Sequence, residues 1–178
     1  FGGLFNRATV PFYWKDFEPK PGLTRYKESV IDTEDWWNSR SKPWLELHWR
    51  RPATDPIVEW CQERGVMTHG HPLIWGSRKW QYPGWMQFEN VPENERRVLD
   101  SLEIMAFSSG AFHVKSYESM SPQKVADLLP TYLKVQEERS VQRIRDIMKY
   151  YEGRIDSWDV VNESAKDFGA GVQDPSLA

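Results

Sequence analysis

The stretch that decides the fold is Arg154-Ile-Asp-Ser-Trp-Asp-Val-Val-Asn-Glu163. It follows a helix-like segment that ends at Gly153, and most of its length is apolar or bulky. A short run of this kind after a helix and a glycine predicts a buried parallel strand. The carboxyl end of such a strand is where parallel α/β folds place chemistry. Asn162 and Glu163, at that end, are therefore candidate functional residues.

Two further strands are expected upstream. Residues 4–10 are rich in apolar and β-branched side chains and stop before a proline. Residues 66–75 follow the glycine that ends a helix and are expected to form the next strand and its exit loop. Both are followed by long, polar and aromatic segments, residues 23–52 and 76–118, which we interpret as loops. A helix near residues 92–105 is expected inside the second loop.

Proline and capping signals mark the helices. The first is expected to start with Thr54 or Asp55 as its N-cap and Pro56 at its first position. Ser121-Pro122 predicts another start, and Pro130 divides that region into a short and a long helix. The residues of the long helix that are spaced for one buried face are Val141, Ile144, Met148 and Tyr151.

The order strand, helix, strand, helix, strand predicts the α/β class, with a parallel sheet and covering helices. Long loops after the strand ends favour a (β/α)8 TIM barrel over a flat sheet. Three strands cannot close a barrel that needs eight. Residues 1–178 are therefore either part of a longer chain or a smaller fold.

The composition limits the classes of partner. The chain has 178 residues and a net charge of −3, so it lacks the basic surface expected for nucleic acid or an anionic membrane. Aromatic residues make up 14% of the chain, more than a core of this size needs, and flat rings suit the faces of sugars. Cys61 is the single cysteine, so no intrachain disulfide can form.

The residues at the strand ends fit glycoside hydrolysis, in which one carboxylic acid protonates the leaving oxygen and a second attacks or activates water. Glu163 alone does not make that pair, and it could instead be a solvated helix-start residue beside a turn residue, Asn162. A competing interpretation is a metal-dependent hydrolase. His69 and His71, two apart on a strand, point to the same side, but further ligands would be needed.

Four motifs in order resemble glycoside hydrolase family 10, the endo-1,4-β-xylanases. The motifs are Trp14 with Glu18-Pro19 and Gly22, Gly70-His-Pro-Leu-Ile-Trp75, Pro83-Gly-Trp85, and Trp158-Asp-Val-Val-Asn-Glu163. They are similar to the family's Trp…Glu-Pro…Gly, Gly-His-Thr-Leu-Val-Trp, Pro-x-Trp and acid/base segments. The resemblance implies a (β/α)8 barrel and a retaining mechanism. It also implies that residues 1–178 are an incomplete glycoside hydrolase catalytic domain, which covers roughly strands 2 to 4 and lacks the N- and C-terminal parts of the barrel.

The resemblance also implies roles for individual residues. Glu163 would be the general acid/base, Asn162 would bind the 2-hydroxyl of the sugar undergoing cleavage, and His71 and Trp75 would line that subsite. The remaining expected substrate contacts are Tyr13, Trp14 and Trp85. The leading interpretation includes no cofactor and no metal; its alternatives are a non-catalytic carbohydrate-binding barrel and the metal hydrolase.

Two departures from the family pattern affect these expectations. Tyr13 stands where the family usually has lysine, so stacking is expected to replace hydrogen bonds there. The family's nucleophilic glutamate has no counterpart before Ala178, so the isolated stretch is expected to be inactive. By resemblance the substrate is xylan or a xylo-oligosaccharide, the full-length protein is a monomer, and its location is secreted or periplasmic.

Overall fold

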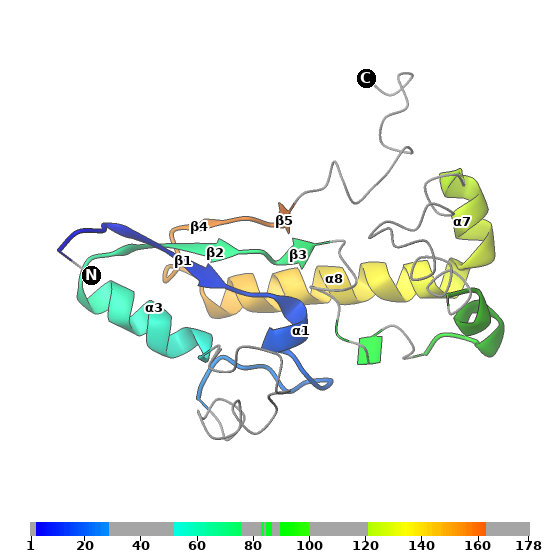
Figure 1. The fold of residues 1–178 in the computed structure, drawn as a ribbon, viewed down its shortest axis with the longest axis horizontal. Helices are drawn as coiled ribbons and strands as arrows, with labels where there is room; N and C mark the ends of the chain where they lie inside the picture. The colour runs from blue at the N-terminus through cyan, green and yellow to red at the C-terminus, as the bar shows by residue number, and fades with distance from the viewer. Residues whose placement is uncertain are drawn as a thin grey trace, which may run out of the picture.

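The computed structural model of the chain describes residues 3–28, 52–75, 83, 85–86, 90–99 and 121–162. Within these ranges the strands lie on one side and the helices cover one of their faces, with the long helix α8, Pro130–Tyr150, running along the strands (Figure 1). This arrangement confirms the α/β class predicted from the sequence. The strands of the described residues form two short parallel sheets and no closed barrel.

The larger sheet contains three parallel strands in the order β1-β2-β4. β1 is Arg7–Pro11, β2 is Met67–His71 and β4 is Ser157–Trp158. β2 is therefore the central strand, with β1 along its whole length and β4 along its second half. The strand predicted at residues 4–10 is confirmed with shifted ends, and the strand predicted within residues 66–75 is β2.

The second sheet pairs β3, Ile74–Trp75, with β5, Val161–Asn162, also in parallel. Backbone hydrogen bonds from Leu73 and Ile74 to the carbonyl oxygens of Asp159 and Val160 join the two sheets. The single strand predicted for residues 154–163 is thus two short strands with a break between them, and Val161 is 44% exposed rather than buried.

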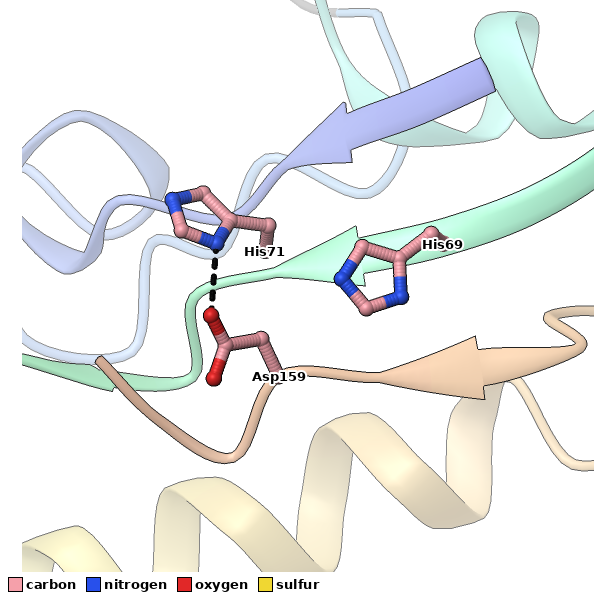
Figure 2. A group of neighbouring side chains, drawn as sticks. All are labelled: His69, His71 and Asp159. Atoms are coloured by element: carbon pink, nitrogen blue, oxygen red, sulfur yellow. Dashed lines mark hydrogen bonds and ion pairs between the residues drawn. The ribbon is translucent and has the colours of Figure 1, made fainter. Parts of the chain in front are cut away.

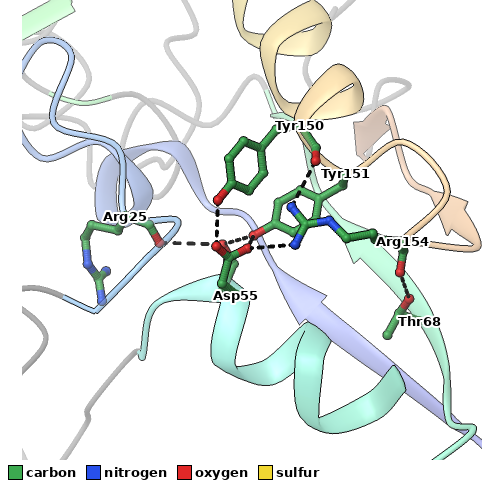
Figure 3. Close-up of polar contacts among 7 residues, drawn as sticks. Arg25, Asp55, Thr68, Tyr150, Tyr151 and Arg154 are labelled. Atoms are coloured by element: carbon green, nitrogen blue, oxygen red, sulfur yellow. Dashed lines mark hydrogen bonds and ion pairs between the residues drawn. The ribbon is translucent and has the colours of Figure 1, made fainter. Parts of the chain in front are cut away.

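Helix α3, Thr54–Glu63, begins after Ala53, so neither predicted N-cap residue is the cap. The carboxylate of Asp55 is engaged elsewhere. It accepts hydrogen bonds of 2.6 Å from the Tyr150 hydroxyl and 2.9 Å from the Tyr151 hydroxyl (Figure 3). A buried carboxylate needs such donors, and this requirement outweighs the local capping preference.

The capping prediction at Ser121 is confirmed. Its hydroxyl oxygen accepts a hydrogen bond from the backbone N–H of Lys124 at the start of α7, Pro122–Leu128. α8 then begins at Pro130, as the second proline predicted. None of the helices within the described ranges has the length and apolar character needed to cross a membrane.

The predicted buried face of α8 is partly wrong. Val141 and Met148 are 39% and 41% exposed, whereas Arg143, Ile147 and Tyr151 are buried along one side of the helix. A pattern based on apolar residues could not place an arginine at the centre of this face. Its contacts, described below, explain why it is there.

Two groups of apolar side chains form the core of the described residues. The larger lies between α8, α3 and the strands and contains Val10, Phe12, Trp14, Phe17, Val58, Leu73, Ile74, Met86, Ile147, Tyr151 and Ile155. The smaller joins the start of α8 to a helix at residues 93–99, which lies within the helix expected near residues 92–105. Most of the predicted loop at 23–52, and much of that at 76–118, lies outside the described residues.

Candidate active site

Side chains from separate elements meet at the carboxyl ends of the strands. Tyr13 follows β1, His71 ends β2, Trp75 ends β3 and Asn162 ends β5. The Tyr13 ring centroid lies 5.9 Å from that of His71 and 6.2 Å from that of Trp75. Trp75 and Asn162 are register partners in the parallel pair, so their side chains project to the same side. The structure therefore brings these four predicted site residues together.

His71 is held by a carboxylate that the sequence analysis did not pair with it. Its Nδ1 atom lies 2.9 Å from Oδ2 of Asp159, with the two side chains 26% and 31% exposed (Figure 2). A carboxylate accepts here, so Nδ1 carries the proton and Nε2 of a neutral ring is left as an acceptor. The signal for this pair was the register: Asp159 N–H donates to the carbonyl oxygen of Gly70, beside His71.

His69 points to the same side of β2 as His71, as the alternation of a strand requires. Its Nδ1 atom forms a hydrogen bond of 3.0 Å with Oγ of Ser157. Ligand-type atoms of His69, His71 and Asp159 all lie within 4.8 Å of one another. The additional ligand that the metal interpretation required is thus present.

The three tryptophans occupy different surroundings. Trp75 is half-buried, and its Nε1 donor has no hydrogen-bond partner among the described residues. Trp85 donates from Nε1 to the carbonyl oxygen of Glu18, and Trp14 donates to the Glu18 carboxylate, both at 2.9 Å. Trp14 is 1% exposed. The structure therefore places Trp14 in the core beside the site and does not bring it to the surface with Tyr13.

A buried arginine underlies this edge of the strands. Arg143 of α8 donates from Nε to the Leu73 carbonyl oxygen at 2.8 Å, and from its guanidinium to the Phe12 carbonyl oxygen. The guanidinium also stacks over the rings of Trp14 and Phe17. Burial lowers the pKa of Arg143 to about 9, which leaves it charged at neutral pH. Sequence reasoning missed it because a charged helical residue ordinarily indicates a solvated face.

Glu163 directly follows Asn162 in the chain but lies outside the described residues. In the sequence it is the residue that follows β5, Val161–Asn162. The distances and contacts given above therefore do not involve Glu163.

Residues 33–176 match the family model described as Glycosyl hydrolase family 10. The chain belongs to this family. The family 10 chain is 26% identical over 121 residues to endo-1,4-β-xylanase A of Xylanibacter ruminicola, covering 68% of the chain and 22% of that protein. It is 20% identical over 141 residues to endo-1,4-β-xylanase 5-like of Arabidopsis thaliana, covering 79% of the chain and 17% of that protein. The family resemblance predicted from the four motifs is confirmed.

The family 10 chain thus spans about a fifth of the length of these curated relatives. A third relative, endo-1,4-β-xylanase 4 of Arabidopsis thaliana, is 21% identical over 110 residues, which cover 12% of its length. The match to the family includes the segment that carries Asn162 and Glu163.

Proposed function

We propose that this chain is the acid/base part of a longer catalytic domain, that of a retaining endo-1,4-β-xylanase. The family membership and the printed names of the three relatives support the class of enzyme. The parallel strands β1, β2 and β4, covered by helices, support placing them as consecutive strands of a (β/α)8 barrel. The substrate is then xylan or a xylo-oligosaccharide.

Glu163 is the proposed general acid/base. In the first step its carboxylic acid donates a proton to the glycosidic oxygen while a second carboxylate, supplied by a strand outside this stretch, attacks the anomeric carbon. In the second step the Glu163 carboxylate takes a proton from water as that water displaces the enzyme from the sugar. Both steps require Glu163 to sit at the edge occupied by Asn162.

The substrate contacts follow from the groups available around that edge. The Asn162 amide binds the sugar 2-hydroxyl, and Nε2 of His71 accepts from a neighbouring hydroxyl while Asp159 fixes its tautomer. The Tyr13 ring stacks on a sugar face, and Trp85 supports the loop by its bond to the Glu18 carbonyl oxygen.

The observation that carries this proposal is the convergence of Tyr13, His71, Trp75 and Asn162 from four separate elements. Rings with polar edges beside an amide form a surface suited to a sugar, which offers apolar C–H faces bordered by hydroxyls. We further propose that the enzyme acts outside the cytoplasm, since polymeric xylan does not cross a membrane. The full-length enzyme is proposed to be a monomer.

A leaving-group series tests the acid role in the enzyme that contains this stretch. Glu163→Ala is expected to slow cleavage of aryl xylobiosides with poor leaving groups roughly 100-fold or more, and to slow activated ones far less. The reason is that a good leaving group departs without protonation. Glu152→Ala, an exposed glutamate after α8, is the matched control and should leave both rates unchanged. Equal losses on both substrate types in Glu163→Ala would contradict the acid role.

A further inference from the structure

We propose that His69, His71 and Asp159 form a binding site for one divalent transition-metal ion, with Zn²⁺ as the ion to test. Ligand-type atoms of the three side chains lie within 4.8 Å of one another. Figure 2 shows the His69 ring directed toward the paired His71 and Asp159 side chains. Nothing in the proposed glycoside chemistry uses this ion, so the site is an additional property of the chain.

The two histidines are held on a rigid strand. β2 pairs with β1 over its whole length, and with β4 at His69 and Gly70, so His69 has a strand on each side and His71 is paired with β1. Two histidines separated by one residue on a strand project to the same side and can bind one ion. Their spacing is therefore set by the sheet rather than by a loop.

The third ligand, the Asp159 carboxylate, comes from the chain segment that lies beside β2. The backbone N–H of Asp159 donates a hydrogen bond of 2.9 Å to the carbonyl oxygen of Gly70, the residue between the two histidines. The Leu73 N–H in turn donates to the Asp159 carbonyl oxygen at 3.0 Å. These two bonds fix the Asp159 backbone, so its carboxylate reaches the histidine pair from one side.

A hydrogen bond orients the ring of His69. Its Nδ1 atom bonds to Oγ of Ser157 at 3.0 Å, which leaves Nε2 as the ligand atom. Ligating histidines commonly bond through their other ring nitrogen in this way, and the bond fixes both tautomer and ring plane. Ser157 is therefore a positioning residue for the ion.

The donor set selects the kind of ion. Two imidazole nitrogens and one carboxylate suit Zn²⁺, Co²⁺ or Ni²⁺, whereas Mg²⁺ and Ca²⁺ prefer sets made of oxygen. Ligand atoms around one Zn²⁺ lie about 3–3.5 Å apart, so a small rotation of these side chains closes the site. His71 and Asp159 are 26% and 31% exposed, which lets an ion enter and leaves a position for water.

Metal binding changes the tautomer of His71. Without metal, the proton on Nδ1 of His71 lies between this nitrogen and the Asp159 carboxylate. An ion bound to Nδ1 of His71 and to the Asp159 carboxylate breaks this hydrogen bond, and the neutral ring then carries its hydrogen on Nε2.

One consequence rests on the proposed function. His71 is also a proposed sugar contact, with Nε2 as the acceptor. An ion on Nδ1 places the ring hydrogen on Nε2, which can then no longer accept, so a bound ion should weaken the binding of a xylo-oligosaccharide. Zn²⁺ would then inhibit the enzyme competitively. Ion binding itself can be measured without any sugar.

The test is titration of the chelator-treated protein with Zn²⁺ by calorimetry and with Co²⁺ by visible absorption. We expect one saturable site per chain, an intense Co²⁺ spectrum, and no comparable binding of Mg²⁺. His69→Ala and Asp159→Asn should each weaken Zn²⁺ binding at least tenfold, and Ser157→Ala roughly tenfold. Glu63→Gln, an exposed carboxylate on α3, is the control and should bind as the unaltered chain does.

His69→Gln keeps a polar partner for Ser157, and it replaces His69→Ala in the titration if His69→Ala does not fold. Equal Zn²⁺ affinity in the unaltered protein and either His69 variant would overturn the proposal, as would a Co²⁺ spectrum identical to that of the aqueous ion. If Zn²⁺ binds as expected but does not compete with xylohexaose, the metal site stands and the proposed sugar contact of His71 is wrong.

Discussion

Arg143, in the middle of α8, donates a hydrogen bond of 2.8 Å from Nε to the carbonyl oxygen of Leu73, between β2 and β3. The same guanidinium donates to the carbonyl oxygen of Phe12, just after β1. One buried cation thus satisfies two backbone acceptors at the edge where the candidate site lies. Packing on Trp14 offsets part of the cost of burying it.

Arg143→Met should destabilise the chain strongly. The substitution keeps roughly the length of the side chain but removes the Arg143 donor from two carbonyl oxygens and the cation from its buried site, at a cost of roughly 1–3 kcal/mol for each lost hydrogen bond. Chemical denaturation with a fitted free energy of unfolding measures the loss. Arg145→Met, two residues along the helix on an exposed position, is the matched control. Similar stability of the two variants would show that the Arg143 contacts do not support the fold.

Gly70→Ala should also be destabilising, for a steric reason. A Cβ atom at Gly70 would overlap the six-membered ring of Trp158 on the neighbouring strand β4. Either the ring or the strand pairing must shift, which costs about 1–3 kcal/mol. Gly3→Ala is the control, because a Cβ there meets nothing within 4 Å. A thermal melt of Gly70→Ala that matches the melt of Gly3→Ala would contradict the close packing of β2 and β4.

These two positions show how much of the fold the sequence could predict. Apolar runs, glycine stops and prolines located the strands and helices, because those signals depend on local geometry. The role of Arg143 could not be predicted, since it depends on two carbonyl groups that are 70 and 131 residues away in the chain. Asp55 was misassigned as a candidate cap for the same reason, because its partners lie on α8.

The candidate site was predictable to a similar extent. Family motifs indicated His71, Trp75 and Asn162, and parallel strands must bring their carboxyl ends to one edge. The His71–Asp159 contact was not predicted, because it depends on the register of β2 against a strand that breaks in two. The role of Glu163 remains a prediction that the experiments above address.

Glu95 provides a test that depends on pH. It is 2% exposed, and its carboxylate accepts backbone hydrogen bonds from Thr131 at 3.1 Å and Tyr132 at 2.7 Å, at the start of α8. Burial alone would raise the pKa of Glu95, but the hydrogen bonds from these N–H groups lower it below its ordinary value of 4.5. The ionised group thus caps a helix whose own N-cap residue, Leu129, has no side-chain acceptor.

Because the folded-state pKa is lowered, this contribution is present above pH 4.5 and is lost as the pH falls through the folded-state value. Glu95→Gln should cost about 1–2 kcal/mol at pH 7 and little at low pH. Denaturant midpoints across pH 3–7 measure the difference. Glu138→Gln, at an exposed position of α8, should show no such pH-dependent gap. A gap for Glu95→Gln that stays constant with pH would rule out the ionised carboxylate as the cap.

Substitutions of Tyr13 test how this residue binds the sugar. Stacking of its ring is proposed to replace the hydrogen bonds of the lysine that is usual in the family. Its ring lies 5.9 Å from His71 and 6.2 Å from Trp75, so it borders the proposed sugar-binding edge. Tyr13→Phe keeps the ring and should bind xylohexaose nearly as well as the unaltered protein. Tyr13→Ala removes the ring and should weaken binding roughly two- to tenfold, as expected for the loss of one aromatic contact.

Calorimetric titration with xylohexaose measures both Tyr13 variants. Trp60→Ala removes a ring of α3 that lies against Arg64, and it controls for the general loss of an aromatic side chain. If Tyr13→Phe loses as much affinity as Tyr13→Ala, the hydroxyl rather than the ring face is the important group. In that case Tyr13 replaces the lysine by hydrogen bonding, and the stacking role is wrong.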